Sequence, residues 1–372
     1  MSNIISILNF ANVSPSQTGG LNNMVRRIAT VENELGITAR ILYFCREKTK
    51  NSIYMQFSGW RNVIKSISGS KLIVIHSVYS FNLFVVAFLC VLKKKKYYIH
   101  AHGSLSEFAR RKGGWKKIAY SPFLFFMIFF SSAIIFSNED EKRHSKLKKK
   151  AIYIPNFIDA ISYHNNKNNV EVNKNKLIYV GKIDYAYKAI DVMLKGFSNF
   201  SSTPNIVGNN YSLHIYGYGK YKNFEINNIM PDDVDVLRLV SDISELHHKN
   251  VHFHGPITSE QLPNILRESG ALVLFSRSEA MPLVISEALS CGVPVLISEQ
   301  TNMGQYVSDS CCGIVVDAFD ENTIAVGFEQ YDKLRDDEWR KMSENAKSCS
   351  SEVLNGVFLK QSISNFIFEA GL

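Results

Sequence analysis

The stretch from Ser276 to Ser298 constrains the fold of this chain most, because it contains a complete strand–loop–helix–turn–strand pattern. Ala271–Phe275, just before it, is a short apolar run typical of a buried strand. Pro282 suits the first turn of a helix, and apolar residues follow it at helical spacing: Leu283, Ile285, Ala288 and Leu289. Gly292 predicts the end of this helix, because glycine accepts the left-handed conformation found there. Val293–Ile297 then predicts the next strand, and this alternation is typical of an α/β fold with parallel strands.

Two glutamates lie on either side of the start of this helix. Glu279 falls in the loop at the carboxyl end of the first strand, and Glu287 falls one to two turns into the helix. The free N–H groups and the positive dipole end of the helix lie between them. The pattern therefore suits a ligand with an anionic centre and hydroxyls at both ends, a shape that sugar nucleotides have. From spacing alone, the alternative is that Glu279 caps the helix and Glu287 is an exposed helical acid.

The string Ser-Glu-Ala-Met-Pro-Leu-Val-Ile-Ser-Glu-Ala-Leu-Ser-Cys-Gly-Val-Pro-Val closely resembles the donor-site motif of retaining glycosyltransferase family 4, also described as glycosyl transferases group 1. The resemblance implies an α/β protein of GT-B fold, with two Rossmann-like domains whose parallel sheets face each other across a cleft. It implies that Glu279 binds hydroxyls of the donor sugar and that Glu287 binds the ribose. It also implies a donor site lined by Met281, Pro282 and Leu283. The resemblance covers nearly the full length but is most specific from residue 177 onward.

Two lysines precede a second predicted helix. Lys182 follows Gly181, and Lys188 stands where an apolar helical pattern begins. Cations at a helix N-terminus oppose the helix dipole, so they make better sense if an anion binds there. The spacing resembles the family pattern in which two cations hold the pyrophosphate, although Lys182 stands where arginine is usual and lacks its bidentate fork. The alternative is a pair of solvent-facing lysines.

Glycines mark two further places where backbone can approach a ligand. Gly19 and Gly20 follow the apolar run Asn3–Phe10 and resemble the family's loop over the donor diphosphate. They do not form a dinucleotide fingerprint, and a plain turn is the alternative. Gly217 follows another strand pattern, and we expect it at the donor site as well.

Histidines occur in pairs two residues apart. His100 and His102 are predicted to share one face of a strand, which could be half a metal site, but no acidic residue nearby in the sequence would complete it. The string His-Gly-Ser-Leu resembles the family's N-domain motif, which implies that His102 approaches the donor sugar and that His100 is structural. His252 and His254 suggest zinc only superficially, because they too lack further ligands at a suitable spacing.

The chain is long enough for two domains. We expect an N-terminal domain over residues 1–165, a nucleotide-sugar domain over 166–354 and a final helix at about 355–372 that packs back on the first domain. Asn165–Lys176, rich in Asn and Lys, is the best candidate for the linker. Six cysteines without framework spacing, and no signal peptide at the start, predict reduced cytosolic thiols.

Charge and aromatic residues concentrate in the first half of the chain. Residues 1–160 contain 24 Lys and Arg against 8 Asp and Glu, a net of +16, and the remainder contains 18 against 26, a net of −8. The apolar runs Phe81–Leu92 and Pro122–Phe136 are too short to cross a bilayer core of about 30 Å. We therefore expect peripheral attachment to an anionic membrane surface, on the cytoplasmic face of the inner membrane. The alternatives are helices packed under the sheet and uneven solvation charge without a partner. No nucleic-acid-binding module is recognisable.

The predicted function is transfer of a hexose-type sugar from a UDP- or GDP-sugar to a hydroxyl of a lipid-linked glycan, in surface polysaccharide or O-antigen synthesis. The resemblance implies retention of configuration, no bound metal or other cofactor, and His102, Glu279 and Lys188 as catalytic residues. The alternatives are a non-catalytic lipid- or glycan-binding protein on the same fold and a sugar-nucleotide epimerase.

Overall fold

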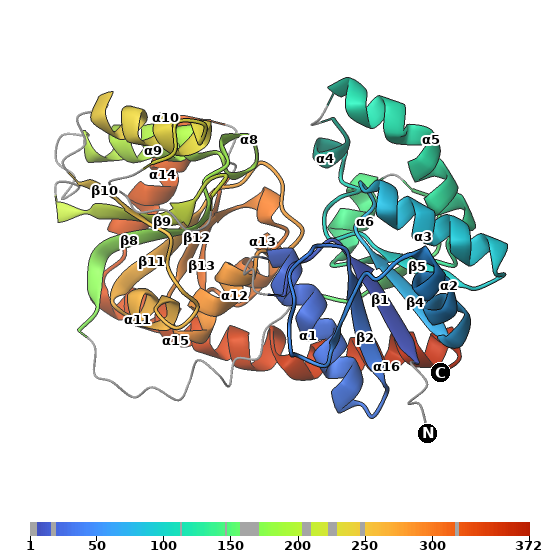
Figure 1. Cartoon of the computed structure of the whole chain (residues 1–372). Coiled ribbons are helices and arrows are strands. Elements are labelled where there is room, and N and C mark those ends of the chain that lie inside the picture. The colour runs from blue at the N-terminus through green and yellow to red at the C-terminus, as the bar shows by residue number, and fades with distance from the viewer. Residues whose placement is uncertain are drawn as a thin grey trace. The chain divides into compact units, whose positions relative to one another are not determined.

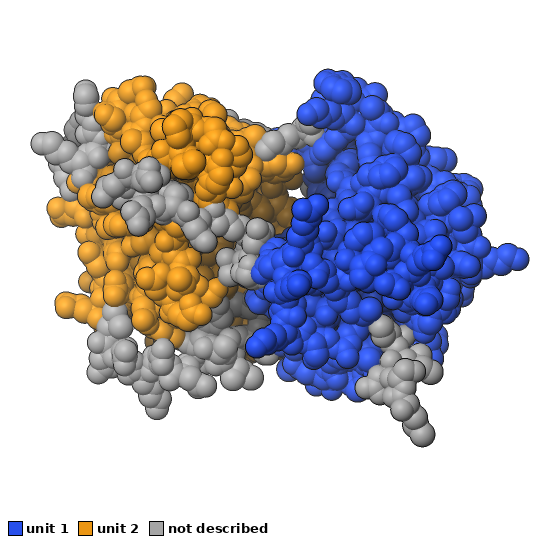
Figure 2. Space-filling model, in the orientation of Figure 1, with its two compact units in different colours: residues 1–156, 357–372 blue, residues 157–356 orange. Residues whose placement is uncertain are grey.

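The computed structural model describes residues 6–15, 20–111, 114–145, 147–156, 171–202, 210–221, 229–245, 250–316 and 320–372 (Figure 1). The chain divides into two compact units (Figure 2). Unit 1 comprises Met1–Asn156 and Val357–Leu372, and unit 2 comprises Phe157–Gly356. Each unit has its own parallel sheet and its own core, so the prediction of two parallel α/β domains is confirmed.

Unit 1 alternates strands and helices along the chain. Its elements are β1 (Ile7–Ala11), α1 (Gly20–Glu34), β2 (Ala39–Tyr43), β3 (Tyr54–Gln56), α2 (Trp60–Gly69), β4 (Leu72–His76), α3 (Phe81–Leu92), β5 (Tyr97–His100), α4 (Glu107–Arg111), α5 (Gly114–Phe130), β6 (Ile134–Phe136), α6 (Glu139–Ser145), β7 (Ala151–Tyr153) and α16 (Gly356–Ala370). Within the described residues the sheet has the order β3-β2-β1-β4-β5-β6-β7, and every pair is parallel. This is the doubly wound Rossmann order, which reverses direction between β1 and β4.

Alternation along the strands gives the sheet of unit 1 two buried faces. Leu8, Phe10 and Ile75 belong to the core cluster that includes residues of α2, α3 and α5. Ile7, Val74 and Tyr98 belong to the other cluster, which includes residues of α1 and α16. The last helix of the chain therefore completes a core that begins with the first strand.

Unit 2 repeats the same plan. Its elements are β8 (Asn173–Lys182), α8 (Tyr185–Lys188), α9 (Ile190–Ser201), β9 (Ser212–Tyr218), α10 (Val234–Glu245), β10 (Val251–Gly255), α11 (Leu262–Arg267), β11 (Ser269–Leu274), α12 (Leu283–Ser290), β12 (Val295–Ser298), the 3₁₀ turn η2 (Glu299–Thr301), α13 (Gly304–Asp309), β13 (Gly313–Val316), α14 (Glu321–Asp332), α15 (Asp336–Ser348) and the π-helical turn η3 (Cys349–Val353). The parallel order β10-β9-β8-β11-β12-β13 reverses direction between β8 and β11. In a doubly wound sheet, ligands bind at the carboxyl ends of the strands that flank this reversal.

The linker prediction is wrong over residues 173–176, because β8 already begins at Asn173. Tertiary contacts override the polar composition of this segment. The carbonyl of Lys174 accepts a hydrogen bond from the Tyr331 hydroxyl, at 3.1 Å, and Asn173 pairs with Ser269 on β11. Residues 157–170 of the region around the predicted linker lie outside the described part of the chain.

Candidate active site

The loop between β11 and α12 is fixed by hydrogen bonds to the connection that follows β12. The backbone N–H of Glu279 donates to the carbonyl of Gln300 at 3.0 Å, and the side-chain amide of Asn302 donates to the carbonyl of Glu279 at 2.6 Å. The Glu279 carboxylate accepts a hydrogen bond from Ser276 at 3.3 Å and forms an ion pair with Lys188. The side chains of Lys188 and Glu279 are only 16% and 18% exposed, so much of this pair is shielded from solvent.

Lys188 owes its position to a short helix. The Asp184 carboxylate caps α8 by accepting from the N–H of Tyr187, and Ala189 breaks the helix with a left-handed conformation at φ 46°. Because α8 ends there, Lys188 lies just before the start of α9. Lys182 ends β8 and behaves differently, since it is 51% exposed and its ammonium lies 3.7 Å from Asp184. Of these two lysines, Lys182 is therefore the one whose side chain is more open to solvent.

Arg277 joins α8 to the loop that carries Glu279. Its guanidinium donates to the carbonyl of Tyr185 at 2.6 Å and to both oxygens of Asp191 at 3.1 Å, and its N–H donates to the carbonyl of Tyr187. Sequence reasoning missed this residue. Its position two residues before Glu279, just ahead of the quoted motif, was the available signal.

The remaining donor-site candidates lie as follows. Pro282 occupies the N-cap of α12 rather than its first turn, which corrects the prediction by one residue, and Gly292 follows the helix at φ +74° as predicted. Met281 is buried, Leu283 opens α12, and Glu287 lies partly exposed in its middle. Gly217 has a packing reason to be glycine, because a Cβ there would lie 2.1 Å from the carbonyl oxygen of Gly181 on β8. Gly20 is the exposed first residue of α1, and Gly19 lies outside the described residues.

These positions coincide with the reversal of strand order in unit 2. Lys182 ends β8, and Glu279 follows β11, its neighbour in the sheet. The N-terminus of α12 opens toward the same edge, because α12 follows β11 directly in the chain. Positive charge and helix N–H groups thus gather where doubly wound sheets bind anionic ligands.

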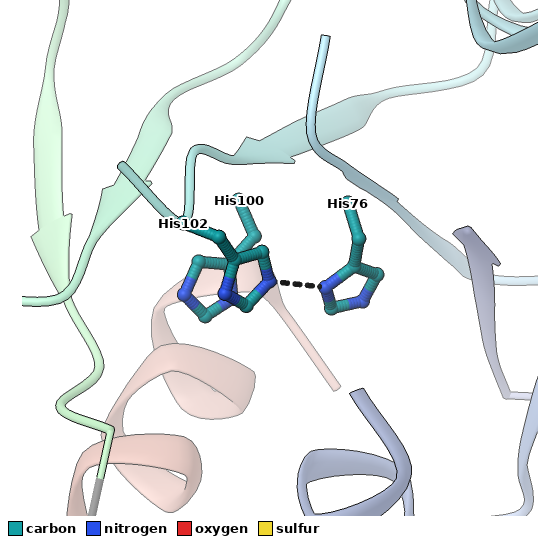
Figure 3. A group of neighbouring side chains, drawn as sticks. All are labelled: His76, His100 and His102. Carbon is teal, nitrogen blue, oxygen red and sulfur yellow. Dashed lines mark hydrogen bonds between the residues drawn. The ribbon is translucent and has the colours of Figure 1, made fainter. Parts of the chain in front are cut away.

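A histidine cluster lies at the corresponding edge of unit 1. His76 ends β4, His100 ends β5, and the two residues are paired in the register of these parallel strands. His102 follows β5 in a turn with φ 47°, so the prediction that it shares a strand face with His100 is wrong. The turn nevertheless brings the His102 ring onto that of His100, with centroids 3.7 Å apart, and Nε2 of His102 within 2.8 Å of Nδ1 of His76 (Figure 3).

Two buried polar residues stand behind His76. Its Nε2 lies 2.9 Å from Oδ1 of Asn9 on β1, and Nδ2 of Asn9 donates to the Glu32 carboxylate on α1 at 2.8 Å. Burial lowers the pKa of His102 to about 3 and lowers the pKa values of His76 and His100 as well, so all three rings are neutral near pH 7. Glu32 is not one of the possible metal ligands, but it is linked to His76 through Asn9.

The turn that carries His102 is held by Glu141. The carboxylate of this buried residue accepts from the N–H of Gly103 at 2.5 Å and from the N–H of Ser137 at 2.7 Å. Burial raises the pKa of the Glu141 carboxyl. Glu141 thereby ties the residue after His102 to the end of β6.

The ring nitrogens of the three histidines are close enough together to bind one metal ion. Within the described residues they form the one group of three or more His, Cys, Asp or Glu side chains whose donor atoms all lie within 4.8 Å of one another. However, both nitrogens of His76 are engaged in hydrogen bonds, one with Asn9 and one with His102, and the rings of His100 and His102 are stacked on each other. The arrangement is that of a hydrogen-bonded network, and the absence of a metal remains a prediction.

Solved structures of low sequence identity share this fold over the whole chain. The structure titled Anabaena Alr3699/HepE in complex with UDP and glucose aligns with a TM-score of 0.78 at 15% identity, covering 98% of this chain and 100% of the other. The N-terminal domain of Candida albicans trehalose-6-phosphate phosphatase aligns with a TM-score of 0.74 at 14% identity, covering 99% and 97%. The predicted GT-B fold is confirmed by these likenesses.

Sequence comparison points the same way. A protein of 41.2 kDa from the cps region of Klebsiella pneumoniae is 25% identical over 70% of each chain. An Escherichia coli UDP-Gal:alpha-D-GlcNAc-diphosphoundecaprenol alpha-1,3-galactosyltransferase is 27% identical over 35% of this chain and 34% of its own. The family described as Glycosyl transferases group 1 matches residues 162–348. With half of its length matched by that family and the GT-B fold around the site, the chain belongs to the group 1 glycosyl transferases.

Proposed function

We propose that the protein transfers a hexose-type sugar from a UDP- or GDP-sugar to a hydroxyl of a lipid-linked glycan, with retention of configuration and without a bound metal. The pairing of Lys188 with Glu279 beside the reversal point of the unit 2 sheet carries this proposal. Similar structures of Anabaena Alr3699/HepE are complexes with UDP and with UDP-glucose, which supports a uridine nucleotide as the first donor to test. The name of the galactosyltransferase relative includes a diphosphoundecaprenol acceptor, which supports a lipid-linked one here.

The reaction needs stabilisation of the departing diphosphate. Negative charge grows on that leaving group, and preorganised cations and N–H donors lower the barrier most effectively where the charge develops. Lys188, Lys182 and the N-terminus of α12 would supply them. The ion pair with Glu279 holds the Lys188 ammonium in place before the donor binds, so less ordering is required on binding.

The other predicted roles complete the proposal. Glu279 would accept hydrogen bonds from hydroxyls of the donor sugar, Glu287 would bind the ribose diol, and Met281, Pro282 and Leu283 would pass close to the donor. Gly19, Gly20 and Gly217 would let backbone approach it. His102 would contact the sugar and orient the acceptor, and its neutral ring suits a hydrogen bond to a hydroxyl rather than to an anion.

A donor-binding screen tests this function. Thermal shifts would be measured with UDP-glucose, UDP-galactose, UDP-N-acetylglucosamine and GDP-mannose on the wild type, Glu287→Ala and Lys188→Met. We expect one donor to stabilise the wild type, with the stabilisation lost in both variants and kept in Glu344→Gln, which alters an exposed glutamate on α15. A shift of equal size in Lys188→Met and the wild type would contradict the proposed role of Lys188.

We also propose that helix α5 attaches the protein to an anionic membrane surface. One stripe of this helix is apolar and exposed at helical spacing, and its residues are Trp115, Ile118, Pro122, Phe125 and Phe129. The four members other than Pro122 are between 59% and 73% exposed. The opposite side packs on α3, where the Phe84 and Phe123 rings lie 4.7 Å apart, so the apolar stripe is additional to the core.

Unit 1 also carries exposed basic residues on these two helices, with Lys116 on α5 and Lys93 and Lys94 at the end of α3. Among the residues that the structure describes, no helix combines the length and apolar character needed to cross a bilayer. Co-sedimentation with phosphatidylglycerol vesicles tests the attachment. We expect the double variant Phe125→Ser, Phe129→Ser to lose most binding and Phe368→Ser, at an exposed phenylalanine of α16, to keep it. Equal binding by both variants would refute attachment through α5.

A further inference from the structure

Glu32 is a buried carboxyl that the proposed reaction does not use. It lies on α1, is 1% exposed, and faces the amide of Asn9 on β1. Apart from burial, the influence on its pKa is the hydrogen bond from Asn9, and the two act in opposite directions. Burying a carboxyl is costly unless it has hydrogen-bond partners. The partner of Glu32, Asn9, is itself hydrogen-bonded to His76.

An unbroken series of hydrogen bonds links Glu32 to His102. Asn9 is 2.8 Å from Glu32 and 2.9 Å from His76, and His76 is 2.8 Å from His102. Asn9 and His76 have no exposed surface, so water does not compete for these bonds. Asn9 and the neutral His76 each offer one donor and one acceptor to their two neighbours. The direction of donation at the Glu32 end of the series therefore fixes the direction of donation at the His102 end.

The direction of the series follows from an ionised Glu32. A carboxylate only accepts, so Nδ2 of Asn9 points to it and Oδ1 points to His76. Oδ1 also only accepts, so Nε2 of His76 carries the proton and Nδ1 of the neutral ring does not. His102 must then donate from Nε2, which leaves its Nδ1 as an acceptor.

We propose that Glu32 is a positioning residue for His102: acting through Asn9 and His76, its carboxyl decides which ring nitrogen of His102 carries the proton. This inference rests on the proposed function for its meaning, because His102 is the residue expected to meet sugar hydroxyls. With Glu32 ionised, His102 presents an acceptor at Nδ1.

Addition of one proton from solvent to Glu32 gives the carboxyl an O–H donor and allows every bond to reverse, with each imidazole staying neutral and its single proton moving from Nε2 to Nδ1. The carboxyl then donates to Oδ1 of a turned Asn9 amide, and Nδ2 of Asn9 donates to Nε2 of His76. Nδ1 of His76 in turn donates to Nε2 of His102, so the proton of His102 lies on Nδ1. Burial raises the pKa of Glu32 to about 8, so both settings fall within an accessible pH range.

Nitrogen NMR of the full-length chain tests this inference, because protonated and bare ring nitrogens have well-separated ¹⁵N shifts. The protein would be labelled at histidine, His102 assigned with His102→Gln, and spectra recorded from pH 6 to pH 10. We expect the proton of the His102 ring to move from Nδ1 to Nε2 as the pH rises, so that the ¹⁵N shifts of the two nitrogens change places in a single titration near pH 8. The same titration should occur in Glu34→Gln, which alters an exposed acid on the same helix, and should vanish in Glu32→Gln.

Asn9→Asp provides a second test that does not depend on how well Glu32→Gln folds. An aspartate there accepts from Nε2 of His76 and should hold His102 with its proton on Nε2 across the whole range. A wild-type His102 whose nitrogen shifts do not change between pH 6 and pH 10 would overturn the inference. The measurement needs neither donor nor acceptor, so a failure of glycosyl transfer with the titration intact would count against the proposed function alone.

Discussion

Each unit contains three histidines on two adjacent parallel strands or just beyond them, yet the two groups have different surroundings. In unit 1, His76 and His100 end their strands and are buried, and His102 stacks over them. In unit 2, His214 lies near the start of β9, and His252 and His254 lie exposed on the edge strand β10. His214 and His254 are hydrogen-bonded at 2.8 Å, the same separation as His76 and His102.

The two hydrogen-bonded histidine pairs differ in the further partner of their first ring. His214 is backed by the Ser212 hydroxyl at 3.1 Å, whereas His76 is backed by Asn9 and the buried carboxyl of Glu32. The unit 1 group lies at the carboxyl ends of β4 and β5, where doubly wound sheets bind ligands, whereas the unit 2 group joins His214, the third residue of β9, to the exposed edge strand β10. Proximity of histidines is thus common to both groups, and only position and burial distinguish a candidate site from a surface pair.

The largest expected contrast is in activity. His102→Ala should lower kcat by about 100-fold, the scale typical of losing a preorganised hydrogen-bonding group at a reacting centre. His254→Ala should change it by less than about twofold, because that ring lies at an exposed sheet edge. Steady-state rates with the donor identified in the screen would measure both. Equal losses in the two variants would remove the functional distinction between the groups.

A second contrast concerns the free energy of unfolding. His76→Leu leaves Oδ1 of Asn9 and Nε2 of His102 without their partner, and buried orphaned polar groups cost about 1–3 kcal/mol each. His214→Leu should cost less than about 1 kcal/mol, because solvent can replace its partners. Urea unfolding of both variants at pH 7.5 would measure the two costs. A smaller cost for His76→Leu than for His214→Leu would show that the buried series contributes nothing to stability.

A third prediction sharpens the comparison through pH. The pKa of Glu32 rises from 4.5 to about 8 on folding, so between these values the folded state binds more protons and its stability falls as pH rises. Glu32→Gln removes this dependence. The stability of the variant minus that of the wild type should therefore grow from pH 4.5 to pH 8, by an amount on the order of 5 kcal/mol, and then level off. Denaturant titrations at pH 5, 7 and 9 test this, and a constant difference would mean that the carboxyl titrates normally.

The smallest effect is expected in unit 2. Burial beside His254 lowers the pKa of His214 from 6.5 to about 4, so stability that is present above pH 6.5 is lost as pH falls toward 4. The ring is about half exposed, and solvent screening should keep the effect below about 1 kcal/mol. Comparing His214→Asn with the wild type at pH 7 and pH 5 isolates it. A wild-type advantage that is larger at pH 5 than at pH 7 would reverse the predicted sign.

Local patterns predicted the elements of the fold well where they were strongly periodic. The apolar run Phe81–Leu92 forms helix α3 with the same bounds, and Gly292 ends its helix by adopting a positive φ. The short strands β3 and β7 were not predicted, because three residues carry too little periodicity. The strand β8 was shortened in the prediction because its first residues are polar and paired only through tertiary contacts.

The residues of the candidate sites were harder to predict, because their contacts depend on which strands and helices are neighbours in the fold. His76 was missed because only the order of the sheet makes β4 and β5 neighbours. Glu32 resembles any helical acid until α1 is placed over β1. Arg277 acts through the carbonyl groups of α8, and no spacing rule predicts such contacts. In each case the missing information was which elements are adjacent, not which residues are chemically capable.

The place of α16 has a consequence for the order in which the chain can fold during synthesis. Leu359, Ile363, Phe366 and Ile367 are buried in the same cluster as Ile7 and Val74. Unit 2 is complete once residue 356 has left the ribosome, whereas unit 1, although translated first, must wait for a helix encoded some two hundred residues later. The nascent chain therefore carries an unfinished apolar face on unit 1 until α16 has been synthesised, and its dependence on chaperones should concentrate there.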